Sequence, residues 1–180
     1  MTIKNDKIRI LGKGITALAL KDKFPNATLY DDKDFENYDL QSEELTVVSP
    51  GIPPYNNMVL NSKNVVSDYD LFEDIIPFSI WISGTNGKTT TTQMCQHLLK
   101  EYNSVCGGNI GIPLSHMDEK APIWILETSS FTLHYTNKSK PNIYLLLPIS
   151  EDHITWHGSF KEYQDAKLKP LTLMNENEIA

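Results

Sequence analysis

A glycine-rich stretch in the middle of the chain carries the residue types that hold phosphate. Residues 83–92 read SGTNGKTTTT, so two glycines and a lysine stand just ahead of a run of hydroxyl groups. A continuous apolar segment, residues 78–83, precedes this stretch, and a segment with helical spacing follows it. A loop between a strand and a helix points backbone N–H groups and the positive end of the helix dipole at one anion. The pattern predicts a phosphate site, and the triphosphate of ATP is the expected ligand.

The predicted phosphate loop is a shortened form of the P-loop. The strict pattern has a further glycine five positions before Gly87, where this chain has Ile82. In a P-loop the lysine reaches the phosphates and the next hydroxyl binds Mg²⁺, which are the roles expected for Lys88 and Thr89. The alternative is a glycine turn followed by an exposed helix start. The residues expected to contact the nucleotide are Gly84, Thr85, Asn86, Gly87, Lys88, Thr89 and Thr90.

A weaker glycine pattern, GKG at 12–14, follows an apolar segment near the amino terminus. The third glycine of the dinucleotide-binding fingerprint is replaced here by Ala17. Asp31 and Asp32 end the next apolar segment, where an acidic residue can accept a hydrogen bond from a ribose hydroxyl. A nucleotide-type ligand and a plain strand-to-helix turn remain equally weighted explanations for this pattern.

Three further stretches carry polar residues at places where ligands bind. Asn109 lies in the glycine loop GGNIGIP, and Glu127 ends an apolar segment in LETSSF, at the carboxyl end of a predicted strand. Residues 150–169 space His153 and Lys167 across a loop and the start of a helix. Each has a structural alternative: a capping glutamate, a loop histidine or a solvated lysine. Their occurrence together after a phosphate loop favours one shared site.

The order of apolar segments and glycine turns predicts an α/β protein in two blocks. Strand, turn, helix, strand is the pattern of a parallel sheet covered by helices. The strands are expected at residues 7–11, 27–31, 45–49, 78–83, 122–127 and 142–147. Helices are expected after residue 14, from Thr89, and from Phe160 to about Met174. We expect a boundary between the blocks at Pro77. The apolar helix faces are expected at Ile15, Leu18 and Ala19, and at Met94, Cys95, Leu98, Leu99 and Tyr102.

Composition and charge narrow the classes of partner. The formal net charge of −7 gives no basic surface of the kind that nucleic-acid binding needs. A phosphate site must therefore be built locally, from backbone N–H groups, a few lysines and a metal. Cys95 and Cys106 show no metal-binding spacing and do not indicate a disulfide framework. Cysteines that form no disulfide favour a reducing, cytoplasmic location. No apolar run is long enough to cross a membrane, so we expect no membrane partner.

The motifs GTNGKTTT, GGNIGIP, ETSSF and EDHxxxHGSF, in this order, resemble those of the Mur ligases of bacterial cell-wall synthesis. The residues of GGNIGIP and ETSSF are similar to those of the family members that add D-glutamate to UDP-N-acetylmuramoyl-L-alanine. The resemblance implies a Rossmann-like UDP-sugar-binding domain over residues 1–77 and a P-loop ATP-binding central domain over residues 78–180. It also implies a carboxy-terminal domain that is absent here. We therefore expect an incomplete central domain that belongs to a longer, monomeric protein.

The resemblance also implies roles for the residues of the second block. Lys88 and Thr89 would bind the ATP phosphates and the first of two Mg²⁺ ions, and Glu127 would bind metal. His153 would bind the second Mg²⁺; because imidazole is an unusual Mg²⁺ ligand, contact with the substrate is the alternative. Lys167 matches the lysine that the family carbamylates with CO₂, and a plain pair with Asp165 is its alternative. Lys88, His153 and Lys167 are the implied catalytic residues, and Thr89, Glu127, His153 and carbamylated Lys167 the implied metal ligands.

For the UDP-sugar, the resemblance implies that the turn at residues 14–16 holds the diphosphate and that Asn109 lies near the reacting end. The full implied set is Gly14, Ile15, Thr16, Asp31, Asp32, Ser49, Gly51, Asn109 and Ser129. Two positions depart from the family. Thr155 stands where an aspartate is frequent, and the uridine-side residues 31–34 lack the arginine of some relatives.

The implied reaction is ATP-dependent amide formation of the EC 6.3.2 type, in peptidoglycan synthesis. Its partners are UDP-N-acetylmuramoyl-L-alanine, D-glutamate and ATP. We expect this chain alone to bind the UDP-sugar with little or no turnover. The alternatives are a sister ligase that adds another amino acid, and a P-loop switch or kinase.

Overall fold

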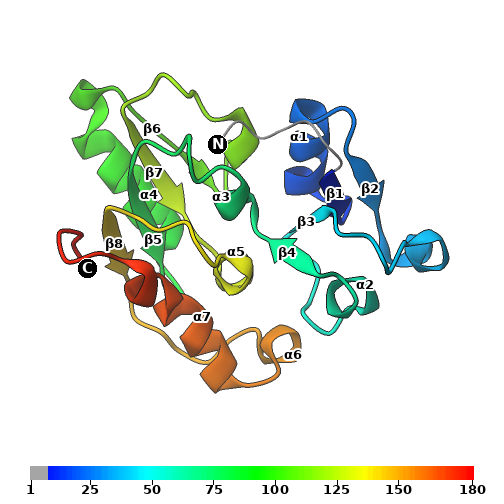
Figure 1. Cartoon of the computed structure of the whole chain (residues 1–180). Coiled ribbons are helices and arrows are strands. Elements are labelled where there is room, and N and C mark those ends of the chain that lie inside the picture. The colour runs from blue at the N-terminus through cyan, green and yellow to red at the C-terminus, as the bar shows by residue number, and fades with distance from the viewer. Residues whose placement is uncertain (1–7) are drawn as a thin grey trace.

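The computed structural model describes residues 8–180, which form two parallel four-stranded sheets (Figure 1). The first sheet has the strand order β2-β1-β3-β4 and the second has the order β6-β7-β5-β8. The strands of the first sheet are β1 (Ile8–Leu11), β2 (Thr28–Tyr30), β3 (Leu45–Val48) and β4 (Asn64–Val66). Those of the second are β5 (Phe78–Ser83), β6 (Ser104–Gly108), β7 (Ile123–Glu127) and β8 (Ile143–Leu146). The parallel pairing confirms the predicted α/β class.

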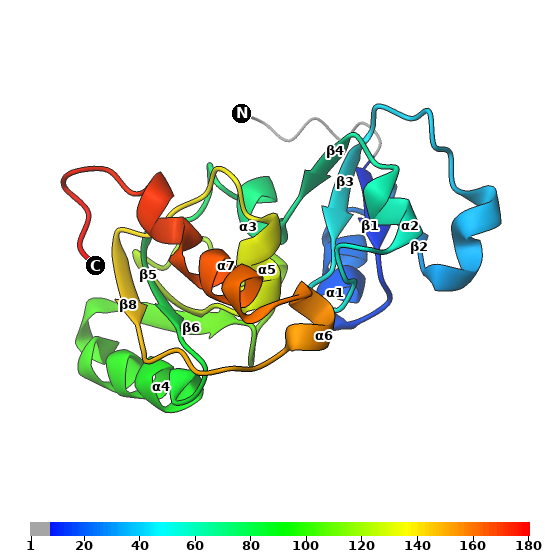
Figure 2. The same cartoon turned by 90° about the horizontal axis from the view of Figure 1, so that it is seen from below.

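Helices connect the strands and cover the second sheet on both faces. Figure 2 shows α4 on one face of this sheet, and α3, α5 and α7 on the other. The α-helices are α1 (Ile15–Lys23), α2 (Asn57–Leu60), α3 (Asp68–Leu71), α4 (Lys88–Leu98), α5 (Ser130–Tyr135), α6 (Ile154–His157) and α7 (Phe160–Leu173). Three 3₁₀ turns complete the elements: η1 (Asp32–Asn37), η2 (Lys100–Tyr102) and η3 (Leu114–His116).

The second sheet is apolar on both faces because successive side chains of a strand point to opposite sides. Ile80 and Ile82 of β5 pack with Ile125 of β7 and with Cys95 and Leu99 on the α4 side. Between them in the sequence, buried Trp81 points into the core on the other side of the sheet. A strand that is buried on both faces needs a continuous apolar run, which is why residues 78–83 could be recognised from the sequence.

The predicted apolar faces of two helices are only partly right, since Ala19, Cys95 and Leu99 lie on the buried sides but the other predicted residues do not. In α1 the exposed residues are Ile15 and Leu18, whereas Ala17 and Leu20 are buried against the sheet. In α4 and η2, Met94, Leu98 and Tyr102 are exposed, and the buried side is formed by Thr92, Cys95 and Leu99. Each helix carries two apolar stripes, and the sheet covers only one of them.

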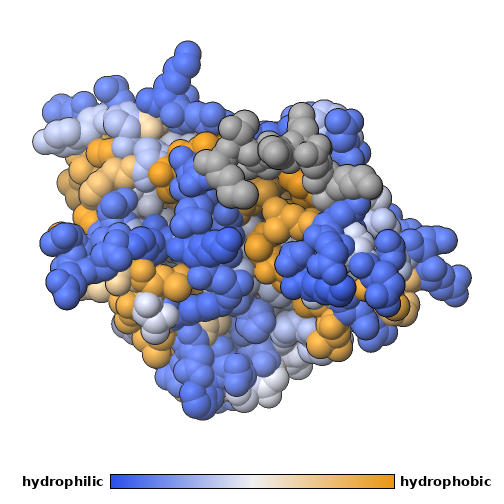
Figure 3. Space-filling view, viewed as in Figure 1, coloured by the Kyte–Doolittle hydropathy of each residue, from blue (hydrophilic) through white to orange (hydrophobic). Residues whose placement is uncertain are grey.

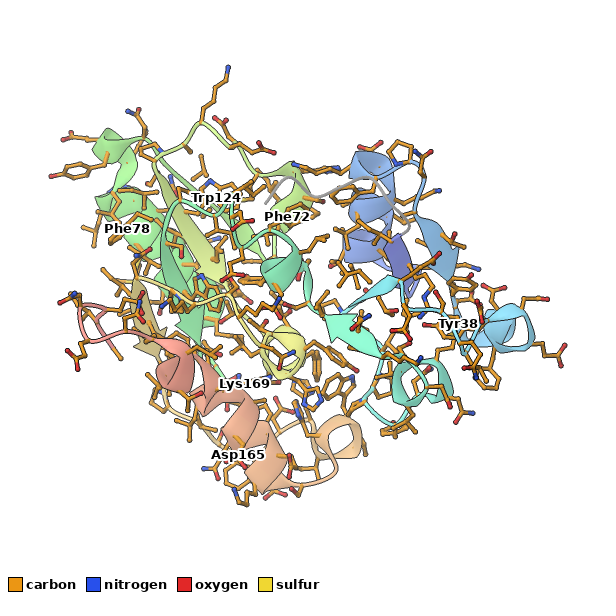
Figure 4. The ribbon with its side chains drawn as sticks, viewed as in Figure 1. Tyr38, Phe72, Phe78, Trp124, Asp165 and Lys169 are labelled. Atoms are coloured by element: carbon orange, nitrogen blue, oxygen red, sulfur yellow. The ribbon has the colours of Figure 1, made fainter. Side chains whose placement is uncertain are left out.

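The two sheets share one hydrophobic core. Leu20 and Phe24 of α1 belong to the same cluster of buried side chains as Phe72, which follows α3, and Trp124 of β7 (Figure 4). The rings of Phe24 and Phe72 stack with their centroids 6.0 Å apart. Helix α1 also packs against η3, which lies between β6 and β7. The division into domains at Pro77 stays a prediction.

Two strands, β4 and β6, were not predicted. The first is the three-residue segment NVV, and the second, SVCGG, ends in two glycines that the sequence pattern assigns to a loop. Near the carboxyl end, Ile179 forms an isolated parallel bridge with Ile143 of β8.

The face of the molecule shown in Figure 3 is mostly hydrophilic, with smaller hydrophobic areas between the polar side chains. Among residues 8–180, no helix combines the length and the apolar composition that a bilayer crossing requires.

Candidate functional site

The phosphate loop lies at the carboxyl end of β5, where parallel sheets place their ligands. Gly84 has φ +138°, and a Cβ there would lie 2.5 Å from the Cβ of Leu147, so only glycine fits. Gly87, with φ +85°, is the N-cap of α4. The Lys88 ammonium donates to the carbonyl oxygens of Gly84 (3.0 Å) and Thr85 (2.8 Å). The ammonium therefore lies on the loop itself, with two of its three N–H donors bound to these carbonyls.

Glu127 joins the phosphate loop to the second glycine loop. Its carboxylate, at the carboxyl end of β7, accepts a hydrogen bond from Thr89 Oγ1 at 2.8 Å and one from Asn109 Nδ2 at 3.1 Å. The backbone N–H of Asn109 also donates to the Glu127 carbonyl at 2.8 Å. Gly108 allows this approach, since a Cβ there would lie 2.7 Å from the same carbonyl oxygen. Three of the predicted site residues are thus in direct contact around a carboxylate that is only 3% exposed.

Lys167 lies behind the phosphate loop and is only 1% exposed. Its ammonium donates to the Gly84 carbonyl at 2.8 Å and lies 4.8 Å from the centroid of the Tyr163 ring. Burial, reinforced by the charge of Lys88, lowers the pKa of Lys167 to about 7. The alternative pair with Asp165 is wrong, because Asp165 is bound by Lys161 on the exposed side of α7.

His153 stands at the edge of this group. It is the N-cap of α6, with φ +53°, and its ring packs 4.7 Å from Phe131 and 6.1 Å from Tyr163, centroid to centroid. Tyr163 in turn shares a 2.9 Å hydrogen bond between its hydroxyl and that of Thr85. Contacts thus lead from the phosphate loop to His153, whose Nε2 lies 3.4 Å from an oxygen of Asp152.

The predicted metal ligands are only partly assembled. Thr89 and Glu127 are in contact. Within residues 8–180, no group of three or more His, Cys, Asp or Glu side chains is placed to hold a metal. Mg²⁺ is usually bound by one or two carboxylates together with substrate phosphates and waters, so a pair of oxygen ligands at a phosphate loop fits this ion.

A cavity of about 380 Å³ lies between the two sheets. Six of the residues predicted to bind substrate line it: Gly14, Ile15, Thr16, Ser49, Gly51 and Asn109. Its volume falls in the range of small-molecule sites. Asn109 reaches both the cavity and Glu127, so the cavity ends beside the phosphate loop.

Two other predicted substrate residues, Asp31 and Ser129, are not among the residues that line this cavity. Asp31 caps η1 and pairs with Lys13 at 2.8 Å, and this hydrogen bond lowers the pKa of Asp31. Ser129 caps α5 by accepting from the backbone N–H of Thr132 at 3.1 Å. The side chain of Asp32 lies outside the described residues.

Lys13, Asp68 and Thr132 line the cavity and were missed by the sequence reasoning. A signal existed for Asp68, which comes just after β4 as Glu127 ends β7. The rule that ligands bind at the carboxyl ends of parallel strands would have selected it if β4 had been recognised.

The geometry defines a class of protein: a parallel α/β protein with a P-loop-like phosphate loop beside an inter-sheet cavity. Sequence comparison then gives the family, since the Mur ligase middle domain matches residues 82–180. The chain belongs to the Mur ligase family.

Relatives of this chain include ligases from Campylobacter and Helicobacter. The chain is 49% identical to the UDP-N-acetylmuramoylalanine–D-glutamate ligase of Campylobacter jejuni, over 97% of this chain and 48% of the relative. It is 45% identical to the ligase of the same name from Helicobacter pylori, over 97% of this chain and 47% of the relative. The chain thus spans about half the length of the curated relatives it matches.

A solved structure supports the fold. The UDP-N-acetylmuramate:L-alanyl-gamma-D-glutamyl-meso-diaminopimelate ligase from Neisseria meningitides matches with a TM-score of 0.57, over 96% of this chain and 70% of that chain. The two sequences are 14% identical, so this match concerns the fold alone.

Proposed function

We propose that the chain is the UDP-sugar- and ATP-binding part of a ligase that joins D-glutamate to UDP-N-acetylmuramoyl-L-alanine in peptidoglycan synthesis. The observation that carries this proposal is the position of Glu127, held on one side by Thr89 of the phosphate loop and on the other by Asn109 of the cavity. A substrate in the cavity would present its reacting end where the terminal phosphate of a nucleotide lies. The names of the relatives from Campylobacter and Helicobacter support the choice of substrates.

Amide formation needs activation because the oxygen of a carboxylate is a very poor leaving group. The carboxylate oxygen of the UDP-sugar attacks the γ-phosphorus of ATP, and ADP leaves. The amine of D-glutamate then attacks the acyl carbon, phosphate leaves with the former carboxylate oxygen, and the nitrogen loses a proton. The residues of this chain position the first step, in which two anions must meet.

Electrostatics sets the demand on the site. Two like unit charges 4 Å apart repel by about 1 kcal/mol in water and by about 4 kcal/mol at an effective dielectric constant of 20. The amide N–H groups at the start of α4 and the Lys88 ammonium can offset this repulsion. Lys88 would exchange its two loop carbonyls for phosphate oxygens, which keeps it hydrogen-bonded throughout.

We propose two Mg²⁺ ions as partners of ATP. Thr89 and Glu127 would hold the first, and His153 would contact the second or the substrate. Bound magnesium would neutralise phosphate charge and hold the reacting oxygens in line. Chelation by EDTA should therefore abolish ATP binding to the chain and leave UDP-sugar binding in the cavity intact, as measured by calorimetry.

We also propose that Lys167 is carbamylated by CO₂. Only a neutral amine reacts with CO₂, and a pKa of about 7 leaves roughly half of Lys167 neutral at pH 7. The charge of Lys88, which disfavours the ammonium form of Lys167, would favour the negative carbamate. In ¹³C-bicarbonate buffer, NMR should detect a carbamate carbon in the wild type and none in Lys167→Gln. Equal signals in the two proteins would exclude this site.

Calorimetry with UDP-N-acetylmuramoyl-L-alanine tests the proposed function. We expect the chain to bind this ligand without D-glutamate-dependent release of phosphate. Asn109→Ala should weaken binding about tenfold or more, because it removes a hydrogen bond near the reacting end of the ligand. Asn137→Ala, at an exposed loop, is the matched control.

Binding of ATP without any binding of the UDP-sugar would favour a P-loop switch or kinase instead. With the full-length enzyme, phosphate release that depends on another amino acid would indicate a sister ligase.

We propose, finally, a cytoplasmic monomer that binds neither nucleic acid nor membrane. The formal charge of −7 supports the absence of nucleic-acid and membrane binding, since nucleic acid and anionic lipid would both be repelled. Size-exclusion chromatography with light scattering tests the monomer.

A further inference from the structure

Asp68 is a buried carboxyl group in the wall of the inter-sheet cavity. It is the first residue of α3 and is 7% exposed. Its carboxyl accepts a hydrogen bond from the backbone N–H of Tyr69, at 3.1 Å, within its own helix. Among residues 8–180, no ion pair and no hydrogen bond from another element reaches this carboxyl. Because Asp68 lines the cavity, its remaining hydrogen-bonding capacity is available to a ligand that binds there.

The same cavity is lined by the N-terminus of α1. The turn at residues 14–16 opens α1, a helix of nine residues, and its N–H groups and dipole favour negative charge. A diphosphate held there would share the cavity with Asp68. An ionised carboxyl in this position would repel the ligand, whereas a neutral carboxylic acid would donate a hydrogen bond to it.

The charged groups around Asp68 do not compensate a negative charge. Lys13, on the same cavity wall, is held by Asp31 at 2.8 Å and by Asp34 at 3.4 Å. On α3 itself, Asp70 adds negative charge. Burial raises the pKa of Tyr69, and the negative charges of Asp68 and Glu127 add to this shift.

Within the described part of the chain, residues 8–180, the remaining elements near Asp68 bring no free cation either. His116 of η3, which packs on α3, pairs with Asp22 at 3.2 Å. Thr132 of α5, which lines the cavity, and Ser67, which caps α3, are uncharged.

We propose that Asp68 binds the ligand of this cavity as a neutral carboxylic acid, donating its O–H to an oxygen of a sugar diphosphate, so that binding takes up a proton wherever the free carboxyl is ionised. The class of ligand rests on the proposed function. The proton and the residue that carries it do not follow from that function, and they can be tested separately from it.

The titration behaviour of Asp68 agrees with this geometry. Burial, together with the charge of Asp70, raises the pKa of Asp68 to about 7. In the free protein the carboxyl is then about half neutral at pH 7. A ligand that selects the neutral form loses up to about tenfold in affinity for each pH unit above 7.

Calorimetry with UDP-N-acetylmuramoyl-L-alanine between pH 6 and 8.5 tests the proposal. The phosphates and the carboxylate of this ligand are ionised throughout that range, and its uracil N–H loses its proton at higher pH. Repeating each titration in two buffers of different ionisation enthalpy counts the protons exchanged. We expect proton uptake and weakening binding above pH 7 in the wild type.

Two variants assign the proton to Asp68. Asp68→Asn imitates the neutral acid, so it should bind at every pH about as tightly as the wild type does at pH 6. Asp68→Ala should bind about two- to tenfold more weakly than the wild type at pH 6, because it lacks the donor. Asp165→Asn, an exposed change on α7 (Figure 4), should keep the wild-type pH profile.

Several outcomes would overturn the proposal while leaving the proposed function intact. These are binding without proton uptake, an unchanged pH profile in Asp68→Asn, and a loss of binding in Asp68→Asn at pH 6, which would mean that the ionised form is the one that binds. If wild-type protein that is folded by circular dichroism binds no UDP-sugar at any pH, the proposed function and this inference both fail.

Discussion

Two buried ionisable side chains lie beside the inter-sheet cavity and the phosphate loop, and burial shifts their pKa values in opposite directions. Asp68 at the cavity has its pKa raised to about 7, and Lys167 at the phosphate loop has its pKa lowered to about 7. Burial disfavours the charged form of either group. Near neutral pH both residues are therefore poised between two charge states, which is useful where anionic ligands arrive.

The shift of Asp68 predicts how Asp68→Asn changes stability. The folded-state pKa is raised from 3.8 to about 7, so the folded protein binds more protons than the unfolded chain between these values. The stability from this group is present below pH 4 and is lost as pH rises through 7. Asp68→Asn should be more stable than the wild type at pH 8, by up to a few kcal/mol, and similar at pH 4. Urea unfolding at both pH values measures this difference. An equal change at the two pH values would contradict it.

Lys167→Met should show the opposite dependence on pH. The pKa of Lys167 is lowered from 10.5 to about 7, so between these values the unfolded chain binds more protons than the folded protein. Wild-type stability should therefore rise from pH 7 to pH 10 in CO₂-free buffer, by up to about 1.4 kcal/mol per pH unit, and Lys167→Met should lose this rise. Thermal unfolding over this range is the measurement. Lys161→Met, at an exposed ion pair on the same helix, is the control and should keep the rise.

At the scale of elements, glycine loops bring the site together, and Gly108 shows how. Gly108 has φ +98°, and an added Cβ would lie 2.7 Å from the Glu127 carbonyl oxygen and 2.9 Å from the Tyr69 hydroxyl. Gly111 has φ +71° with open space around its Cβ position. Gly111→Ala therefore suffers only backbone strain, about 1–2 kcal/mol. Gly108→Ala suffers a clash as well, so it should lose clearly more stability in urea unfolding and should also weaken UDP-sugar binding. Equal losses of stability in the two variants would contradict this, because they would show that strand β6 shifts to relieve the clash with no further loss of stability.

The elements that the sequence predicted are those with a strong local signal. Strands β5, β7 and β8 are continuous apolar runs, and the phosphate loop is contiguous in sequence. Strand β4 was missed because it is short, and β6 because it ends in glycines. The predicted apolar faces of the helices were partly wrong for another reason. Ile15 and Leu18 have helical spacing, but tertiary packing chose the side of α1 that carries Ala17 and Leu20.

The same distinction between local signals and tertiary packing separates the parts of the site that could be predicted from those that could not. Contacts within the phosphate loop, and from it to Glu127 at the end of the adjacent strand, could be predicted because strand ends meet at one edge of a sheet. The part of the cavity wall formed by Lys13, Asp68 and Thr132 comes from three separate elements. Asp31 was expected to face a ribose, yet Lys13, which follows the neighbouring strand β1, binds it instead. Such pairings depend on how elements pack, which no local pattern encodes.

At the scale of the whole molecule, the cavity exists because the two sheets are held against each other. The Tyr135 hydroxyl of α5 donates to the Ile52 carbonyl of the first half at 2.8 Å, and Thr136 donates to Ser67 at 2.9 Å. Asp70 accepts hydrogen bonds from three successive backbone N–H groups, at residues 137–139. Polar contacts and the shared core thus fix the distance between the turn at residues 14–16 and Asn109.

A shared core also predicts that the two sheets unfold together. Leu20 of α1 is 1% exposed and belongs to the cluster that contains Trp81 and Trp124 of the second sheet. All three tryptophans of the chain lie after residue 80, so their fluorescence reports on the second sheet and its helices. Leu20→Ala should cost about 2–5 kcal/mol, and it should lower the urea midpoint seen by tryptophan fluorescence as much as that seen by far-ultraviolet circular dichroism. Leu18→Ala, at an exposed position of the same helix, should change neither midpoint. If Leu20→Ala lowers the circular dichroism midpoint while the fluorescence midpoint stays in place, the first sheet unfolds independently, and the cavity walls are not held by one core.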